Sequence, residues 1–493
     1  MAVLLLVLPL GLAIFFLGLL VWTIFKHFLT TEVPSALQHP VKFRILDCMF
    51  IYVITLGNIL EKLRICSMAS VARFVHDRLF TKKKDPKVVV TNLRFGTIPV
   101  RLFQPKAIAC RSRGGIIFYH GGAAVMGSLG KELANLWKRK GVGTWIILPK
   151  MAEESHEIPK PSWSSVCPNV KLIDADEPQG SSLLDIQEIG ADVWLFPGRA
   201  HQNSYHNMCL FLALETDSVL LSVGYRKLPD HHYPVITNDC LNASIHFLKI
   251  LKTYGVNPSQ VVICGESAGG GVVAQVTQAL VSQKDLPQIR AQILIYPTTQ
   301  AINLQLPSFQ QNQNVPFLTR DFMLMCLCKY MAIDLSWRDA MVKGACIPPD
   351  TWKKYRKWLS SDNIRQSVKN RFQESQLRGP FNEAAYLETK HLLDVANAPL
   401  LADDEIIAQL PEAFLVSCEY DVFRDDVLLY KKRLEDQGVP VSWDKDSLFI
   451  MLVRHTVAVW AHVCMTHPEE PCAPLLARST QGMELEALLS VQP

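Results

Sequence analysis

Short apolar runs, separated by turn residues and helical patterns, make up most of the chain from residue 87 onward. Near-continuous apolar runs are typical of strands buried on both faces of a parallel sheet. Five such runs are GIIFYHGG, SVLLSVGY, QVVICGESAGG, AQILIYP and AFLVSCEYD, and KVVVTNLRF with IPVRLFQ predicts a further pair of strands. Between two of the runs, Leu241, Ile245 and Leu248 recur at helical spacing. Strands that alternate with helices predict an α/β fold, a three-layer sandwich with a mostly parallel sheet.

Residues 1–25, MAVLLLVLPLGLAIFFLGLLVWTIF, contain no charged side chain. The run is long enough to span a bilayer, and it exceeds the apolar region of a typical cleaved signal peptide, which is the alternative. It therefore predicts a transmembrane anchor that crosses the membrane once. Lys26, Lys42 and Arg44 follow the run and no basic residue precedes it. The positive-inside rule would accordingly keep the main domain in the cytoplasm.

A second apolar run, CMFIYVITLGNIL, starts at Cys48 within residues 26–86, which we interpret as a linker and cap helices. This run is too short to span a membrane. We therefore expect either a packed helix or a helix that lies in the membrane interface.

Composition narrows the class of protein. A hydrophobic content of 49% and a mean hydropathy of +0.13 fit a folded chain whose apolar excess lies partly at one end. The formal net charge of +4 is small for 493 residues and predicts no nucleic-acid partner. The 13 cysteines include no CxxC pair, so no zinc or thioredoxin signature is present, and we expect no cofactor and no metal. Nothing in the sequence indicates an oligomeric state.

The segment GESAG, residues 265–269, follows an apolar strand and precedes a helical pattern. A GxSxG segment in this context predicts a nucleophile elbow, a sharp turn that exposes the serine hydroxyl at the top of the sheet. The motif alone is weak, and the alternative is an incidental loop serine. The strand before it and the helix after it favour Ser267 as the nucleophile of a hydrolase.

A second motif, FYHGGAAVMGS, directly follows the strand that ends at Tyr119. Adjacent glycines leave backbone N–H groups uncovered, so Gly121 and Gly122 are predicted to bind an oxyanion together with the N–H of Ala268. The alternative for the glycines is a simple tight turn. We expect His120 to orient this loop by hydrogen bonding and not to act as the base.

The acid is predicted at the end of the strand AFLVSC, because catalytic residues of open α/β sheets lie beyond the carboxyl ends of strands. Glu419, Tyr420 and Asp421 follow this strand, and the order serine, acid, histidine is that of α/β-hydrolases. Asp425 and Asp426 open the next helix, where acidic side chains suit the positive end of the helix dipole.

The motifs HGGA, GESAG, GYRKLPDHHYP and YDVFRDDVLLY together resemble the hormone-sensitive lipase branch of the α/β-hydrolases. More narrowly, the chain is similar to arylacetamide deacetylase-like proteins of the like-3 and like-4 type, through segments such as NASIHFLK, LPSFQQNQNVP and GPFNEAAYLE. The resemblance implies that Asp421 is the acid, that residues 87–443 form the hydrolase domain, and that residues 300–400 form its cap.

The same resemblance implies a single-pass membrane protein whose esterase domain lies in the lumen of the endoplasmic reticulum. It also implies acyl esters or aryl amides of lipophilic compounds as substrates. This topology conflicts with the charge pattern beside the anchor, and we follow the resemblance because three basic residues are a weak bias. A lumenal domain would make Asn242-Ala243-Ser244 a glycosylation site, although the helical context is equally compatible with an unmodified asparagine.

Two segments depart from the family pattern. Residues 131–203 lengthen the crossover between two strands far beyond the usual unit of about thirty residues. They are either a surface insertion or translated non-coding sequence, and the second is our preferred hypothesis. The resemblance stops again at Trp443, and residues 444–493 form a divergent tail without the Asp-Gly-Phe-His-Gly turn of the family. We expect this tail to lack the last strand and helix of the domain.

The divergent tail offers His455, His462 and His467, none followed by glycine. His455 is the nearest candidate for the base, although a histidine in an apolar run is more often a packed side chain. Two hypotheses therefore remain open. One is a membrane-anchored carboxylic ester hydrolase, and the other is a non-catalytic relative that binds lipophilic ligands or partners.

Overall fold

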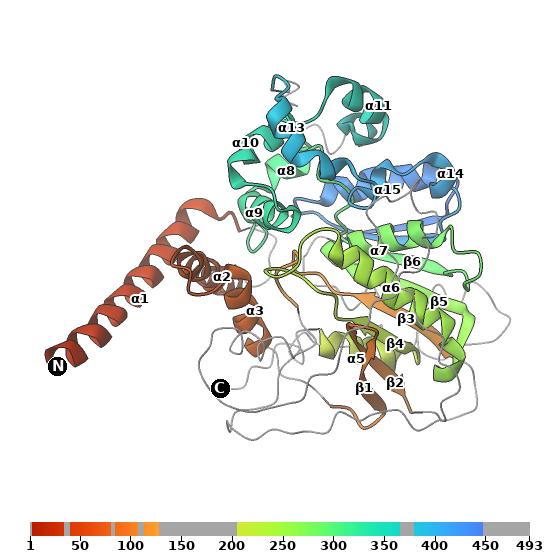
Figure 1. Cartoon of the computed structure of the whole chain (residues 1–493), viewed down its shortest axis with the longest axis horizontal. Coiled ribbons are helices and arrows are strands. Elements are labelled where there is room, and N and C mark those ends of the chain that lie inside the picture. The colour runs from red at the N-terminus through yellow and green to blue at the C-terminus, as the bar shows by residue number, and fades with distance from the viewer. Residues whose placement is uncertain are drawn as a thin grey trace, which may run out of the picture.

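The computed structural model describes residues 2–33, 40–79, 84–106, 113–127, 205–364 and 379–446. The predicted insertion at residues 131–203, most of the tail and all three of its histidines, including His455, lie outside these described residues. Within them the chain folds around one sheet, with helices on both of its faces (Figure 1).

The sheet has 8 strands in the order β1-β2-β4-β3-β5-β6-β7-β8. Their bounds are β1 Val88–Phe95, β2 Ile98–Pro105, β3 Arg113–Tyr119, β4 Val219–Val223, β5 Val256–Glu266, β6 Ala291–Ile295, β7 Glu412–Cys418 and β8 Val441–Asp446. The pairs β1–β2 and β2–β4 are antiparallel, and every other pair is parallel. The mostly parallel α/β sheet predicted from the apolar runs is therefore confirmed.

Helices cover the sheet and build the region above its carboxyl edge. The domain helices are α5 His206–Glu215, α6 Val235–Lys249, α7 Ala268–Leu280, α8 Pro307–Gln311, α9 Arg320–Met331, α10 Arg338–Val342, α11 Pro349–Leu359, α13 Glu383–Thr389, α14 Asp404–Ile407 and α15 Arg424–Asp436. Short 3-10 turns span Leu251–Tyr254, Leu335–Trp337, Ser361–Asn363, Lys390–Leu393 and Pro399–Leu401. Helices α8 to α13 gather above the sheet, where the cap was predicted (Figure 1).

Strand residues divide their side chains between two cores, because successive side chains of a strand point to opposite faces. Ile117 and Ile263 belong to the larger core, which includes α6, α7 and α15. Their neighbours Ile116 and Val262 belong to the smaller core, which includes α5. Burial on both faces explains why these strands are apolar at nearly every position.

The edge strand β8 corrects one expectation about the tail. We expected the last strand to be lost after Trp443, but β8 continues through Asp446. Its register runs parallel to β7 from Ala413↔Val441 to Cys418↔Asp446. The strand therefore extends three residues beyond Trp443, the residue at which the resemblance was expected to stop.

Helix α6 contains the predicted glycosylation sequence. The hydroxyl of Ser244 is fully buried, donates to the carbonyl of Cys240 at 2.7 Å and lies 2.5 Å from the hydroxyl of Tyr119. A glycan is bulky and lies at the surface, whereas Ser244 of this sequence is packed in the core. The folded helix therefore favours an unmodified Asn242.

Three helices precede the sheet: α1 Ala2–Thr30, α2 Pro40–Lys62 and α3 Met68–Leu79. Leu10–Thr30 and Phe43–Lys62 are each long and apolar enough to cross a membrane. Our expectation that the second run is too short to span is therefore wrong as a statement of length. The helix extends from Cys48 back to Pro40, and within it the carboxylate of Asp47 is buried against His27.

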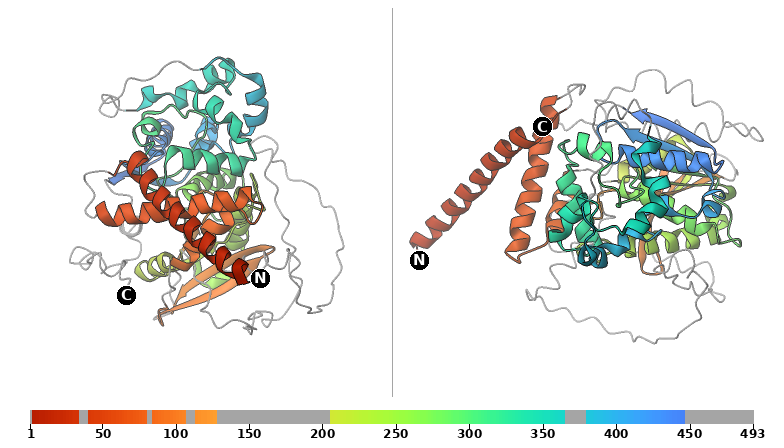
Figure 2. Two further views of the ribbon diagram at one scale, coloured as in Figure 1. Left: turned by 90° about the vertical axis from the view of Figure 1, so that its left-hand side faces the viewer. Right: turned by 90° about the horizontal axis from the view of Figure 1, so that it is seen from above.

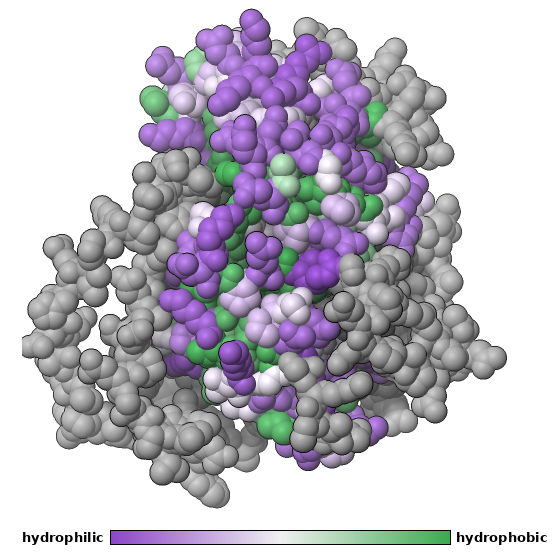
Figure 3. Space-filling view, turned by 90° about the vertical axis from the view of Figure 1, so that its right-hand side faces the viewer, coloured by the Kyte–Doolittle hydropathy of each residue, from purple (hydrophilic) through white to green (hydrophobic). Residues whose placement is uncertain are grey.

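The two apolar helices suggest membrane association, and they project from one side of the domain (Figure 2). Exposed apolar side chains are concentrated on them, among them Phe16, Trp22, Phe25, Leu46 and Met49. On the face turned away from these helices, hydrophilic side chains predominate over the upper part of the molecule (Figure 3). The apolar surface of the described chain is thus strongly one-sided.

Candidate active site

Ser267 occupies a strained turn between β5 and α7. Its φ is +52° and its ψ is −123°, a backbone conformation that a residue with a Cβ adopts only when the surrounding structure enforces it. The Ser267 N–H donates to the carbonyl of Ile295 on β6 at 2.8 Å, and the Ser267 carbonyl accepts from the N–H of Gly271 at 3.0 Å. This geometry is that of the predicted nucleophile elbow.

The glycines around Ser267 are required by close backbone contacts. A Cβ on Gly265 would lie 2.5 Å from the carbonyl oxygen of Gly269, and a Cβ on Gly269 would lie 2.3 Å from the carbonyl oxygen of Tyr119. Each distance is well below a van der Waals contact. The turn can be this sharp only because neither glycine has a side chain.

The glycine loop after β3 places its N–H groups differently from the prediction. The Gly121 N–H donates to Oε1 of Glu266 at 3.0 Å, so in this structure it serves a side chain and not an open site. Gly122 has a φ of +104°, a backbone conformation that residues with a side chain rarely adopt. Gly122 and Ala268 remain the predicted oxyanion donors. Gly121 is still a predicted donor, but the prediction is weaker because its N–H already donates to Glu266.

His120 is buried behind the loop, as expected for an orienting residue. Its Nδ1 lies 2.8 Å from the Gly121 carbonyl and 3.1 Å from the hydroxyl of Tyr225. Its ring stacks between the rings of Tyr205 and Tyr225, at centroid distances of 5.1 and 4.3 Å. Burial, and then the charge of Lys227, lower the pKa of His120 well below its usual value. A neutral, enclosed imidazole suits loop support and not proton transfer to solvent.

Glu266, the variable residue of the GxSxG motif, is a functional candidate that the sequence analysis missed. Its Oε1 accepts the hydroxyl of Tyr205 and the N–H of Gly121, and its Oε2 accepts the hydroxyl of Tyr296 at 2.7 Å. Burial, with Glu266 beside them, raises the pKa of both tyrosines well above 10, so both keep the protons that they donate. Glu266 thereby ties the glycine loop to the elbow.

Asp421 lies just beyond the carboxyl end of β7 and is buried. Its Oδ1 accepts the N–H of Phe423 at 2.9 Å. Its Oδ2 is also buried, and among the described residues it has no hydrogen-bond partner. Burial raises the pKa of Asp421 to about 7, partly offset by the Phe423 N–H and by the charge of Arg424. An open, buried carboxylate oxygen is a suitable acceptor for the N–H of a histidine.

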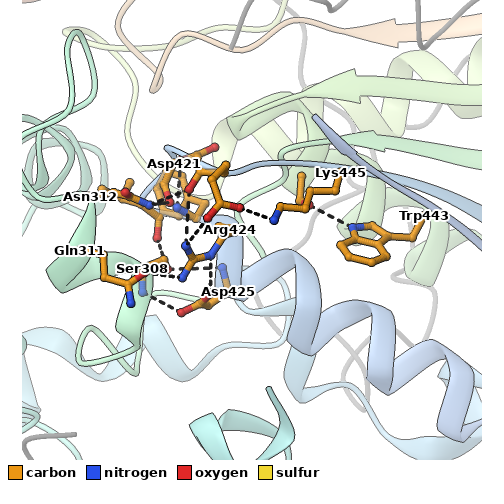
Figure 4. A network of polar contacts seen from close by, with 12 residues as sticks. Ser308, Gln311, Asn312, Asp421, Arg424, Asp425, Trp443 and Lys445 are labelled. Carbon is orange, nitrogen blue, oxygen red and sulfur yellow. Dashed lines mark hydrogen bonds and ion pairs between the residues drawn. The ribbon is translucent and has the colours of Figure 1, made fainter. Parts of the chain in front are cut away.

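A polar network fixes the turn that carries Asp421 (Figure 4). Asp425 accepts the backbone N–H of Ser308 at 2.7 Å and an Arg424 N–H at 2.9 Å, and Asp426 accepts the side-chain amide of Gln300 at 2.6 Å. Asp425 and Asp426 are fully buried. Both lie in the first turn of α15, as predicted, and there they are buried hydrogen-bond acceptors.

The fold brings Ser267 and Asp421 to one edge of the sheet. They follow β5 and β7, which flank β6 in a parallel arrangement. Two interstrand spacings separate these strands by about 10 Å, a gap that an imidazole can bridge by bonding to both side chains. His455, the predicted base, lies outside the described residues.

Comparisons with known proteins agree with this fold. The family described as alpha/beta hydrolase fold matches residues 198–359 and 361–447. Arylacetamide deacetylase-like 4 of Homo sapiens is 57% identical over 443 residues, covering 90% of this chain and 91% of that protein. Arylacetamide deacetylase-like 3 of Homo sapiens is 44% identical over 87% of this chain and 88% of that protein. Arylacetamide deacetylase of Mus musculus is 34% identical over 50% of this chain and 63% of that protein.

Proposed function

Because the chain belongs to the alpha/beta hydrolase fold family and, within it, to the arylacetamide deacetylase-like proteins, we propose that it is a membrane-anchored serine hydrolase. The proposed substrates are acyl esters or aryl amides of lipophilic compounds. The observation that carries the proposal is the strained elbow at Ser267, since a φ of +52° at a serine needs a reason beyond stability.

In the proposed reaction, the Ser267 hydroxyl attacks the acyl carbon and forms a new C–O bond. Its proton passes to a histidine, for which His455 is the predicted residue, and then to the departing alcohol or amine. The N–H groups of Gly122 and Ala268 stabilise the oxyanion of the tetrahedral intermediate. Asp421 accepts the histidine N–H at its open Oδ2, and water then releases the acid from the acyl-enzyme by the reverse proton path.

A fluorophosphonate probe tests this proposal in full-length protein purified in detergent. The expected result is one covalent adduct, located by peptide mass spectrometry on Ser267. The proposal is contradicted if near-ultraviolet circular dichroism shows that the protein is folded and no adduct forms.

The location is proposed as the membrane of the endoplasmic reticulum, with a single-pass anchor in α1 and the domain in the lumen. The apolar helices support membrane association, and the lumenal side rests on the family resemblance. Protease treatment of intact microsomes tests the side. A protected domain that becomes digestible after the membrane is opened is expected, and digestion in intact vesicles contradicts the lumenal placement.

Asp421 also supports a second candidate, a non-catalytic relative without a histidine base. If no imidazole bonds to Oδ2, the pKa near 7 persists, because the carboxylate is desolvated and only partly compensated. The folded chain then holds a proton that the unfolded chain, with a pKa of about 4, has lost. The contribution of Asp421 to stability accordingly falls as pH rises from about 4 to about 7, and stays low above that range.

The pH dependence of Asp421→Asn separates the two candidates. If the protein is non-catalytic, the natural chain loses stability from pH 5 to pH 8 and the variant does not. The free energy of unfolding of the variant, relative to that of the natural chain, therefore rises by on the order of 1–3 kcal/mol between these two pH values. If the protein is a hydrolase, a histidine that donates to Oδ2 favours the ionised form of Asp421. The relative stability of the variant then does not rise from pH 5 to pH 8. Urea unfolding at both pH values provides the measurement.

A further inference from the structure

The side chain of Asn312, just after α8, holds the turn that carries Asp421. Its buried amide nitrogen donates to the carbonyl of Asp421 at 2.7 Å and to the carbonyl of Glu419 at 3.2 Å. Ser308, one turn earlier, donates its hydroxyl to the carbonyl of Val422 at 2.7 Å. Figure 4 shows both side chains reaching from α8 to the acid turn. Three carbonyl groups of the acid turn, those of Glu419, Asp421 and Val422, thus accept hydrogen bonds from one short segment, residues 308–312.

The residues after Asn312 form a compact loop. The Val315 N–H donates to the Asn312 carbonyl at 3.3 Å, and the Arg320 N–H donates to the Gln313 carbonyl at 2.9 Å. Phe317, near its tip, has a φ of +66°, which is unfavourable for a bulky residue. This conformation persists only if neighbouring groups enforce it.

The two apolar N-terminal helices supply those neighbouring groups. Oδ1 of Asp47, on α2, accepts the Phe317 N–H at 2.8 Å. The Glu32 N–H, just after α1, donates to the Asn314 carbonyl at 3.0 Å. The rings of Phe43 and Phe50, both on α2, lie 6.1 and 6.0 Å from the Phe317 ring. The loop is therefore bonded to the N-terminal helices at its tip and to the acid turn at its base.

Asp47 can connect these segments because its carboxylate is buried and both of its oxygens have hydrogen-bond partners. Its Oδ2 lies 2.7 Å from Nδ1 of His27 and accepts the Thr31 hydroxyl at 3.1 Å, so one side chain joins α1, α2 and the loop. Removing it would leave His27, Thr31 and the Phe317 N–H without this acceptor. Such a loss costs more than the exchange of one surface contact.

We propose that Asp47 and Asn312 are positioning residues that connect the N-terminal helices to the acid turn through the loop from residue 312 to residue 317. In this arrangement the seating of α1 and α2 determines how firmly Asp421 is held. The inference deepens the proposed function, and it rests on that function for the part that Asp421 plays in catalysis. The geometric link between the helices and the turn is independent of it.

Hydrogen–deuterium exchange of the full-length chain in detergent tests the link without any need for activity. Asp47→Ala and Asn312→Ala are each expected to speed amide exchange in residues 419–424 by about five- to tenfold. Asp47→Asn keeps an oxygen that can accept the Phe317 N–H, and slow exchange is expected to persist in it. This milder variant keeps the test decisive if the alanine variant does not fold.

Glu61→Ala provides the matched control. Glu61 is another carboxylate of α2 that reaches the cap, where it pairs with Lys329 on α9, and it also accepts the Met68 N–H at 2.6 Å. Its hydrogen bonds in the described part of the chain go to Met68 and Lys329, and not to the loop from residue 312 to residue 317. Its loss is expected to leave exchange in residues 419–424 unchanged.

Three outcomes would overturn the inference: unchanged exchange at the acid turn in Asp47→Ala, an equal rise in Glu61→Ala, or a rise confined to residues 312–317. Ester turnover adds a second measurement, in which Asp47→Ala is expected to lower kcat and leave KM nearly unchanged. If the natural chain neither labels with the probe nor hydrolyses esters, the proposed function fails, and the exchange data still decide whether the link exists.

Discussion

Replacing Ser267 by alanine is expected to lower kcat for ester hydrolysis about 10⁵- to 10⁶-fold and to abolish labelling by the fluorophosphonate probe. The change removes only the Oγ atom that attacks the acyl carbon. Alanine keeps the Cβ, so the strain at a φ of +52° is unchanged, and the backbone bonds to Ile295 and Gly271 persist. Folding should therefore be intact. The measurement is initial-rate kinetics on a short-chain ester, with a thermal unfolding curve for both proteins.

Ser267→Gly is the matched control for the strain. Glycine adopts positive φ without a penalty from a Cβ, so this variant is expected to be as inactive as the alanine variant but more stable, by about 1 kcal/mol. Residual turnover above one hundredth of the natural rate in either variant would show that another group is the nucleophile.

Replacing Gly269 by valine is expected to prevent folding of the domain. Its Cβ would lie 2.3 Å from the Tyr119 carbonyl oxygen and 2.6 Å from the His120 carbonyl oxygen. These atoms belong to the end of β3 and the first residue after it, and β3 is paired on both sides, with β4 and β5, so they cannot retreat. Because α7 must move away from the sheet, we expect a loss above about 3 kcal/mol, measured as insoluble expression or a large fall in the urea midpoint.

Gly96→Ala separates this clash from the general difficulty of replacing glycine. Gly96 lies in the turn between β1 and β2 with a φ of +56°, and no atom lies within 4 Å of an added Cβ. The cost is then conformational alone, about 1 kcal/mol, and the domain should remain folded. If the two variants lose similar stability, the close approach of α7 to β3 is not what requires Gly269.

The sequence was sufficient for the strands and the elbow because local patterns encode both. Strands such as β5 are buried on both faces, so their apolar runs are visible without any neighbour, and GESAG needs only the strand before it and the helix after it. The sequence led us to expect a shorter apolar run than α2 contains, because the charged residue Asp47 interrupts the run just before Cys48. Only the folded partners, His27 and Thr31, show that its charge is buried and compensated.

Side-chain partnerships across the fold were equally beyond the sequence. Glu266 looked like a variable position of a motif, yet it binds the loop that follows a different strand, 145 residues away in the chain. Asn312 was one polar residue in LPSFQQNQNVP, and its bonds to the acid turn span 109 residues. No periodicity or spacing marks such contacts, because they depend on which loops meet above the sheet.

By itself, then, the sequence determined the family, the α/β sheet, the nucleophile Ser267 as a prediction and the acid turn, since short-range pattern and chain order carry that information. Only the tertiary structure showed that the Gly121 N–H donates to Glu266 and that Oδ2 of Asp421 has no hydrogen-bond partner among the described residues. It also showed that Asp47 and Asn312 bond the loop to the apolar helices and to the acid turn. The physical reason is that hydrogen bonds and burial form between residues distant in the chain, and their free energies depend on distances that no linear pattern records.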